Sequence, residues 1–483
     1  MLSAIWLIPV AGGILVTAFP HRFGKWLGVI VAGAVLVLTA YLAYAFDPGA
    51  HGYQFVERVQ WIPGLHVDYH LGVDGISLWL LVLNALIGLI AVLATPVDMR
   101  NSSRFIALLL VMQGGMAGVF LAVDLLVFYV FFEAMLIPAY FLLWMWGEGP
   151  RPLRAALKFV LFTLVGSLLM LVGIIGEYVF SGASSFDLTT LAQHQPSSHL
   201  QFGLFFLFAA AFAVKTPLFP LHSWLPDAYL AAPTPMLLAF AGVMGKTGAY
   251  AMLRVLVPLF HSPVWWWDWD QVLPVLAVAG IIWGSLLALA QTDMKAVVAY
   301  SSIAHMAFIV LGIFSFNAQG QQGAVVQMVN HGLIVAALFL IVAWIERRAG
   351  SRDLRSVRAL GARMPVLAGI FVVVTMAALG LPGLNSFVGE FMILLGAWKY
   401  SAVLTVIACI GLVLTPVYML RLFQGSMQGA PDATERTPLI DLRGSELALL
   451  APLVILMFVL GLYPYVLTRV MTVTALGLGL PWS

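Results

Sequence analysis

The segment Ala213-Val-Lys215-Thr-Pro-Leu-Phe-Pro220-Leu-His222 decides the fold class, because it places a lysine and two prolines inside a long apolar stretch. Lys215 lies 16 residues after His199 and 12 before Asp227. At helical rise the nearer polar end is about 18 Å away, which is farther than a lysine side chain can reach. A second long stretch, 364–398, is interrupted by Gly380-Leu-Pro-Gly-Leu-Asn-Ser386. Because proline removes a helix hydrogen bond, we expect both stretches to be broken helices at membrane depth.

The composition of the chain excludes a water-soluble globule. Of its 483 residues, 62% are hydrophobic and 9% are charged, whereas soluble domains carry about 25% charged residues. The net charge is +2, and no basic run with interleaved aromatic residues points to nucleic acid. The single cysteine, Cys409, excludes thiolate-ligated iron–sulfur clusters, structural zinc of the cysteine type and an intramolecular disulfide.

The apolar stretches predict an all-α polytopic membrane protein with about 14 transmembrane helices, at about 20 residues per crossing. They lie near residues 2–19, 26–46, 74–95, 104–122, 124–146, 155–180, 200–230, 233–258, 271–290, 295–314, 322–346, 364–398, 400–424 and 446–468. The two interrupted stretches are the seventh and the twelfth, five crossings apart. Because five is odd, two repeated five-helix units would be inverted relative to each other, as in many transporters.

This spacing divides the chain into four parts. Residues 1–103 hold helices 1 to 3 with an exposed outer loop over 47–74, and residues 104–260 hold the first repeat, helices 4 to 8. Residues 271–424 hold the second, inverted repeat, helices 9 to 13, and residues 425–483 hold a loop and helix 14.

Basic residues in alternate loops predict the orientation. One set of loops holds 17 lysines and arginines and the opposite set holds four. Since the cytoplasmic side retains basic residues, we expect both termini on the outer side of the membrane.

Three ionisable residues lie far from either membrane surface and are candidates for proton transfer. Glu133, in Phe131-Phe132-Glu133-Ala-Met-Leu-Ile-Pro138, is about 13 Å from its nearer helix end, and Lys246 is nearly central between Pro235 and Pro258. With Lys215, they mark a functional site by default, although Glu133 could also be a structural acid paired with a neighbouring helix. Moving one charge against about 150 mV costs about 3.5 kcal/mol, which making or breaking one buried ion pair can supply.

Histidines and a further glutamate extend this set. His305 and His331 lie well inside two successive spans, where they could be proton relays, haem ligands or hydrogen-bonded core residues. His222 could extend a relay toward the cytoplasm. Glu390 follows the second interruption, but Lys399 nearby also allows a role facing outward. We treat Asp124 and Glu177 as interfacial residues, and Asp293 and Lys295 as loop charges.

Several motifs resemble the antiporter-like membrane subunits of respiratory complex I, and the resemblance covers most of the chain. They are Phe-Phe-Glu133-Ala-Met-Leu-Ile-Pro, Lys215-Thr-Pro-Leu-Phe-Pro-Leu-His222-Ser-Trp-Leu-Pro-Asp, Gly-Lys246-Thr-Gly-Ala-Tyr and Leu-Gly-Val-Asp74-Gly-Ile-Ser. Glu390, where related N-type, L-type and Mrp antiporter chains usually carry lysine, points to the M-type chain, the counterpart of mitochondrial subunit 4. The chain is also too short to include the long lateral helix of an L-type chain.

The resemblance implies 14 helices, two inverted repeats and broken helices 7 and 12. It implies that Glu133 pairs with Lys215, that Lys246 is the central transfer site, and that His305 and His331 link it to Glu390. It places FMN, iron–sulfur clusters and quinone on partner subunits, with no cofactor or metal on this chain, and L-type and N-type chains as neighbours.

Other functions stay open at this point. A Mrp-type cation/proton antiporter subunit or a membrane-bound hydrogenase subunit shares these helices. A haem- or quinone-binding redox protein rests on His305 and His331 alone, and a structural spacer subunit is disfavoured by the cost of unpaired deep charges.

Overall fold

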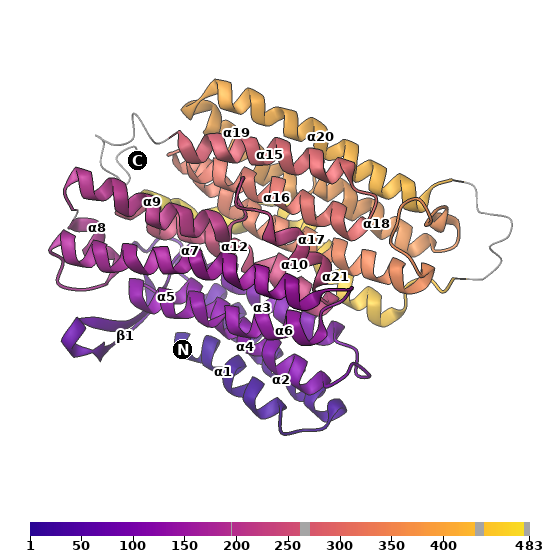
Figure 1. Cartoon of the computed structure of the whole chain (residues 1–483), viewed down its shortest axis with the longest axis horizontal. Coiled ribbons are helices and arrows are strands. Elements are labelled where there is room, and N and C mark those ends of the chain that lie inside the picture. Colours follow the sequence, from indigo (N-terminus) through magenta and orange to yellow (C-terminus); the bar gives the residue numbers. More distant parts are fainter. Residues whose placement is uncertain (195, 261–270, 430–438, 478–483) are drawn as a thin grey trace.

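The computed structural model describes residues 1–194, 196–260, 271–429 and 439–477, and the described part is mostly helical. Helices run side by side along the long axis of Figure 1. The first half of the chain forms α1 (Leu2–Val16), α2 (His21–Ala45), α3 (Ser77–Ala94), α4 (Ser102–Leu121), α5 (Leu125–Ala134), α6 (Leu136–Trp146), α7 (Pro152–Ser181), α8 (Leu188–Gln193), α9 (Ser198–Lys215) and α10 (Trp224–Ala231).

The second half begins with one continuous helical segment of changing pitch. It consists of α11 (Thr234–Ala239), the π-helical turn η2 (Phe240–Met244), α12 (Lys246–Ala251), the π-helical turn η3 (Met252–Leu256) and α13 (Val257–Leu259). The helices that follow are α15 (Val272–Ala290), α16 (Met294–Ile313), α17 (Ala318–Ala349), the short η4 (Leu360–Ala362), α18 (Pro365–Ala378), α19 (Asn385–Tyr400), α20 (Ala402–Met427), α21 (Gly444–Leu462) and α22 (Tyr465–Gly477).

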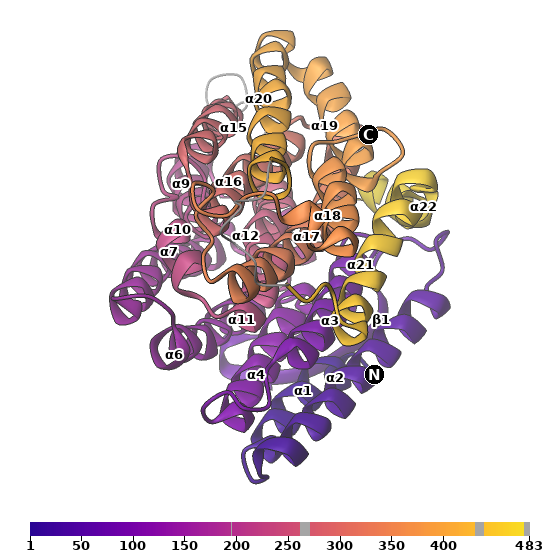
Figure 2. The ribbon, with the colours of Figure 1, turned by 90° about the vertical axis from the view of Figure 1, so that its right-hand side faces the viewer.

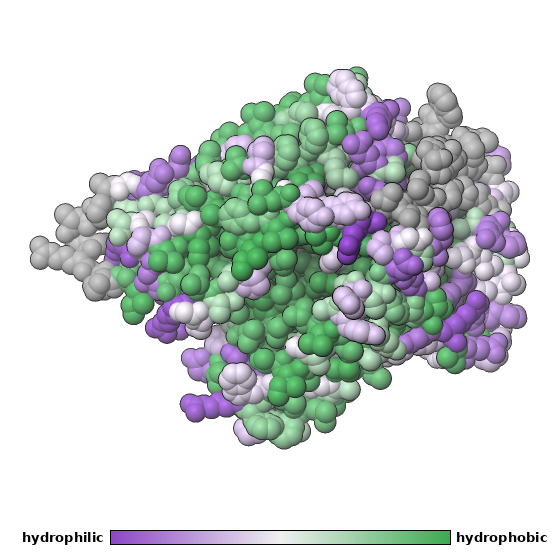
Figure 3. All heavy atoms as spheres, turned by 180° about the vertical axis from the view of Figure 1, so that it is seen from behind, coloured by the Kyte–Doolittle hydropathy of each residue, from purple (hydrophilic) through white to green (hydrophobic). Residues whose placement is uncertain are grey.

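Eleven helices within the described residues are long and apolar enough to cross a membrane, and three shorter apolar helices accompany them. A hydrophobic band covers the middle of the molecule and hydrophilic residues gather at its two ends (Figure 3). This distribution confirms the expectation of a multi-pass helical membrane protein. Figure 2, a view along the helices, shows α1 to α4 on one side of the bundle and α15, α19 and α20 on the other.

One two-stranded antiparallel hairpin accompanies the helices in the described residues. β1 (Gln54–Ile62) pairs with β2 (Val67–Val73) through the short turn η1 (Pro63–Leu65). β2 is buried over much of its length. Leu71 forms a β-bridge with Ala122, and Asp124, two residues further along, forms a β-bridge with Asp187. The expectation of an exposed loop over 47–74 is therefore wrong for β2 and Asp74, which lie against the helix ends.

The two ends of the bundle differ in structure. The N-terminus, the hairpin and α8 lie at the left end of Figure 1, which we call the hairpin end. The turns after α6, between α15 and α16, and after α17 meet at the opposite end, because Lys295 contacts Glu148 and Arg352 contacts Asp293. We call this the loop end.

Candidate functional site

Helix interruptions place the predicted ionisable residues. Pro138 has no backbone N–H, and its ring crowds the carbonyl four residues earlier, so α5 ends at Ala134 with Glu133 in its last turn. α9 ends at Lys215 because Thr216 precedes Pro217, and residues 216–223 separate it from α10. Two acid–base side chains thus adjoin irregular backbone inside the bundle.

The second interruption separates α18 from α19. Gly380 adopts φ +76°, a left-handed conformation that glycine tolerates, and the Leu381 N–H donates to Met376 O at 3.1 Å as the helix closes. A Cβ atom at Gly380 would lie 2.7 Å from Glu390 Oε2. The carboxylate of Glu390 therefore rests against the backbone of the interruption.

Glu133 and Lys215 face each other without a direct bond. In the part of the chain that the structure describes, each of the two acts electrostatically on the other, but no nitrogen–oxygen distance of 4.0 Å or less joins them as an ion pair. The Lys215 Nζ instead lies 4.7 Å from the centre of the Phe132 ring, and its side chain is buried. A cation over an aromatic face is partly compensated. The pair is close enough to interact and free enough to change partner.

Lys246 is enclosed completely. It begins α12, between the two π-helical turns, and its side chain has no exposed surface. Its Nζ donates to the carbonyl of Ala241, which lies in η2. Every residue of the most apolar window of the span 234–259 is buried. Such π-turns occur frequently at functional sites, and here they bracket the central lysine.

Gly248 lets the Lys246 helix approach the interruption after Lys215. A Cβ atom at this position would lie 2.4 Å from Thr216 Oγ1, 2.8 Å from Thr216 N and 3.0 Å from Lys215 Cβ. Only a residue without a side chain fits between the two lysine-bearing segments.

The two histidines connect Lys246 to Glu390. Lys246 acts electrostatically on His331, and the His331 and His305 ring centres are 5.4 Å apart. His305 Nδ1 lies 3.3 Å from Glu390 Oε1. All three side chains of this second half are buried. The structure therefore brings six of the seven predicted residues into one line through the bundle.

His222 lies apart from this line. It is half-buried in the segment between α9 and α10, where its ring stacks on Phe219 with centres 5.9 Å apart. Lys158 acts electrostatically on it, and the same lysine donates to Asp227 Oδ2 and Ser223 O at 2.7 Å. His222 therefore lies on the side of the interruption that faces the loop end.

Neutral polar residues around Glu390 were missed by the sequence analysis. Glu390 Oε1 accepts from Ser386 Oγ at 3.0 Å and from Gln327 Nε2 at 3.2 Å. Asn330 Nδ2 donates to Asn385 O at 2.7 Å. The spacing of Gln327, Asn330 and His331 along one apolar helix was a visible signal, because three and four residues apart share a face.

Three of the four charges assigned to loops or interfaces are more deeply placed than expected, because Asp124, Glu177 and Lys295 are all buried. Lys295, in the first turn of α16, is buried and donates to Ala232 O at 2.8 Å, Leu230 O at 3.2 Å and Glu148 Oε2 at 3.1 Å. Its loop-charge assignment is wrong, because the end of α10 covers it. Glu177, near the end of α7, has no exposed surface, and neither carboxylate oxygen has a hydrogen-bond partner among the described residues.

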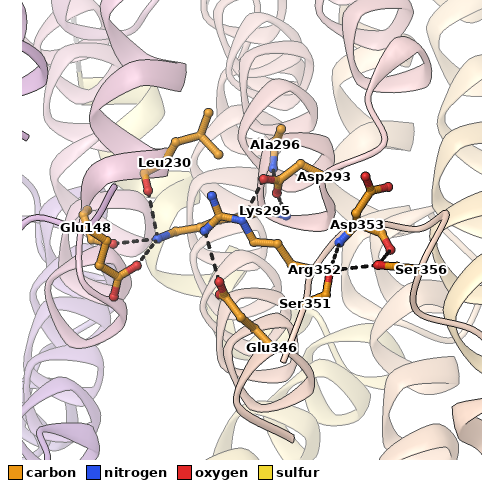
Figure 4. A network of polar contacts seen from close by, with 11 residues as sticks. Glu148, Leu230, Asp293, Lys295, Ala296, Glu346, Ser351, Arg352, Asp353 and Ser356 are labelled. Carbon is orange, nitrogen blue, oxygen red and sulfur yellow. Dashed lines mark hydrogen bonds and ion pairs between the residues drawn. The ribbon is translucent and has the colours of Figure 1, made fainter. Parts of the chain in front are cut away.

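Lys295 belongs to a polar network at the loop end (Figure 4). Asp293 caps α16 by accepting from Lys295 N at 2.8 Å, and Arg352 Nε donates to Asp293 Oδ2 at 2.7 Å. Arg352 also lies 3.6 Å from Glu346 of α17. This network joins the loop-end termini of α10, α16 and α17, the last two of which carry the histidines.

A separate buried cluster closes the hairpin end. Arg254 Nη1 lies 2.8 Å from Asp74 Oδ2, and its guanidinium lies 4.4 Å from the centre of the Tyr53 ring. His70 Nδ1 lies 2.5 Å from Asp187 Oδ2. Burial alone raises the pKa of Asp187, but hydrogen bonds from His70 and Thr189 and the charge of His70 outweigh it and lower the pKa to about 2.

Comparisons with known proteins agree on one family. Residues 122–415 match the family described as NADH:quinone oxidoreductase/Mrp antiporter, TM. NADH-quinone oxidoreductase subunit M of Mycobacterium tuberculosis is 38% identical over 505 aligned positions, covering 96% of this chain and 91% of that protein. The protein of the same name from Pseudomonas aeruginosa is 39% identical, covering 95% and 93%.

Solved structures give the same picture. A chain of respiratory complex I from Thermus thermophilus with bound NADH superposes with a TM-score of 0.92 at 33% identity and full coverage of both chains. A chain of the Mrp complex from Dietzia shares the fold, with a TM-score of 0.84 at 23% identity over 99% of this chain and 52% of that one.

Proposed function

This chain belongs to the family of NADH:quinone oxidoreductase and Mrp antiporter membrane subunits, and we propose that it translocates protons through a line of ionisable residues inside the helix bundle. It is an M-type, antiporter-like membrane-arm subunit of a bacterial NADH:quinone oxidoreductase, like the relatives that it matches over nearly their whole length.

One observation carries the proposed proton path. Half-buried Glu133 interacts with buried Lys215, Lys246 acts electrostatically on His331, and His331, His305 and Glu390 follow one another inside the bundle. Buried ionisable groups are costly in hydrocarbon and are kept where they serve transport. A line of them across the protein provides sites at which a proton can rest and be passed on.

The contacts assign a role to each group. Glu133 stabilises the proton on Lys215, and because no direct ion pair locks them, a small displacement of α5 or α9 changes that stabilisation. Lys246 receives the proton at the centre. His331 and His305 pass it to Glu390, which Ser386 and Gln327 hold in place with hydrogen bonds. His222 extends the path toward the loop end.

The architecture that accompanies this function has 14 crossings. The eleven long helices account for eleven, and α1, α9 with α10, and α18 with α19 account for three more. The seventh and twelfth are broken, and helices 4 to 8 and 9 to 13 form two inverted repeats. The hairpin end faces the periplasm with both termini, and the loop end faces the cytoplasm.

Electron transfer belongs to neighbouring subunits in this proposal. FMN, iron–sulfur clusters and quinone are held elsewhere in the complex, and L-type and N-type chains flank this one in the membrane arm. The 3.3 Å separation of His305 Nδ1 and Glu390 Oε1 supports a relay role for the histidines rather than a haem- or quinone-binding one. The antiporter and hydrogenase alternatives share the fold, but the curated relatives support the oxidoreductase.

The test is Lys246→Met or Glu133→Gln in the assembled complex, reconstituted in vesicles. We expect fewer protons pumped per electron, while electron transfer from NADH to an artificial acceptor at the soluble partner subunits continues. An unchanged proton-to-electron ratio with either variant would overturn the path. The matched control is Glu346→Gln, which removes a half-exposed loop-end carboxylate outside the path.

A further inference from the structure

Lys246 shares one helix face with two further buried polar residues. Tyr250 and Arg254 follow it at intervals of four residues toward the hairpin end, and both are buried. The Tyr250 hydroxyl donates to Phe120 O at 3.2 Å and interacts electrostatically with Arg254. A polar column therefore leads from the central lysine toward the hairpin-end surface.

Arg254 closes this column. Its guanidinium is 2.8 Å from Asp74 and is covered by the ring of Tyr53, and its side chain is only 7% exposed. Asp74 is itself fixed, because its Oδ1 accepts from Ile76 N at 3.1 Å and Ser77 N at 2.9 Å at the start of α3. The guanidinium is thus held in a single place.

The chemistry of arginine distinguishes it from every other residue of the line. Glutamate, lysine and histidine can each take up and release a proton, whereas a guanidinium carries five N–H donors, has no acceptor and stays protonated in proteins. A proton that reaches Tyr250 from Lys246 meets a fixed positive charge that cannot accept it, and the neighbouring carboxylate of Asp74 is already paired with that charge. Fixed arginines exclude protons and cations from other membrane pores in this way.

We propose that Arg254 is a barrier that stops protons from passing between Lys246 and the hairpin side of the membrane. This inference rests on the proposed proton path, in which Lys246 is the central site. Without such a barrier, the membrane potential would drive protons from the periplasmic hairpin side onto Lys246 and back toward the cytoplasm, which would undo the pumping. The Asp74 carboxylate and the two tyrosines position the barrier.

The test measures passive proton leak into vesicles that contain the assembled complex, with a membrane potential imposed and no NADH. Arg254→Gln removes one positive charge about 12 Å from Lys246. At an effective dielectric constant of about 20, this loss of repulsion raises the occupancy of Lys246 by a proton about tenfold. We therefore expect the leak to rise about tenfold. The double variant Arg254→Gln with Lys246→Met should return to the low leak of the native complex.

Arg58→Gln is the matched control, because it makes the same change at a half-exposed arginine of the hairpin end that lies outside the column. We expect no added leak from it, and an equal leak from Arg58→Gln and Arg254→Gln would mean that any disturbance of the hairpin end opens the path, which overturns the proposal. A leak that persists in the double variant overturns it as well. If Arg254→Gln fails to assemble, Arg254→Lys is used, because it substitutes a cation that can release its proton. This variant should leak protons in the same Lys246-dependent manner. An Arg254→Lys complex that leaks no more than the native complex overturns the proposal.

The two proposals fail separately. An assembled Arg254→Gln complex that neither leaks nor loses pumping removes the barrier and leaves the proton path intact. Normal pumping by Lys246→Met removes the path itself.

Discussion

Replacing Gly248 by alanine adds a methyl group that forces the two lysine-bearing segments apart. The added Cβ would lie 2.4 Å from Thr216 Oγ1 and 2.8 Å from Thr216 N. The hydroxyl can rotate away, but the backbone nitrogen cannot. Relief to an ordinary contact therefore requires α12 and residue 216 to separate by about 0.6 Å, and overpacking of this kind costs about 1–3 kcal/mol.

The displacement acts on function as well as on stability. Lys215 immediately precedes Thr216, and Lys246 lies two residues before Gly248. The added methyl group therefore moves one proton site relative to the other. Because a misplacement of about 1 Å can cost about a hundredfold in rate, we expect a clear loss of proton pumping even in complexes that assemble.

The assay compares Gly248→Ala with Gly203→Ala. A Cβ atom at Gly203, in α9, meets no atom within 4 Å, so this control adds the same methyl group to a helix at no steric cost. We expect Gly203→Ala to be neutral or up to about 1 kcal/mol more stable, since alanine favours helix over glycine. Thermal unfolding in detergent and protons pumped per electron are measured for both. Equal behaviour of the two variants would refute the steric reasoning.

Two further predictions concern the ends of the bundle. Lys295→Met leaves the carbonyls of Leu230 and Ala232 without the Lys295 donor, so we expect the free energy of unfolding, followed by thermal unfolding, to fall by about 1–3 kcal/mol. The control Arg355→Gln, at a largely exposed side chain, should have no measurable effect. Equal effects of the two variants would contradict the burial argument. The pKa of Asp187 lies at about 2, below its ordinary value of 3.8, so its stabilisation of the hairpin is complete above about pH 5 and is lost as the pH falls toward 2. The protection of β2 amides, corrected for the intrinsic exchange rate at each pH, should fall as the pH falls over that range in the native protein. Asp187→Asn should show lower protection at neutral pH and lose this acid dependence; an unchanged acid profile would show that another group anchors the strand.

Much of the fold could be predicted from the sequence, because apolar runs long enough to cross a bilayer have few alternatives. The helix ends at Lys215 and Ala378 follow from local proline and glycine chemistry, which needs no tertiary information. For the same reason, the depth of Glu133, Lys215 and Lys246 could be worked out by counting residues along helices.

Features that depend on contacts between distant segments could not be predicted in this way. Arg254 lies near the end of the predicted span 233–258, and only the fold brings Asp74, 180 positions earlier, to its side. Lys295 likewise seemed to be a surface charge until the end of α10 was seen to cover it. The hairpin escaped detection because β1 is largely exposed and has no strict alternation of polar and apolar residues.

The enclosure of the span 234–259 separates the central chemistry from the surrounding lipid. In the most apolar windows of α20 and α21 only 33% and 22% of the residues are buried, whereas the helix that carries Lys246 has no face toward the bilayer. Changes in acyl-chain length or headgroup composition therefore act on the peripheral helices first. The affinity of the central ammonium for its proton is set by protein neighbours alone, so the same machinery can work in membranes of quite different thickness.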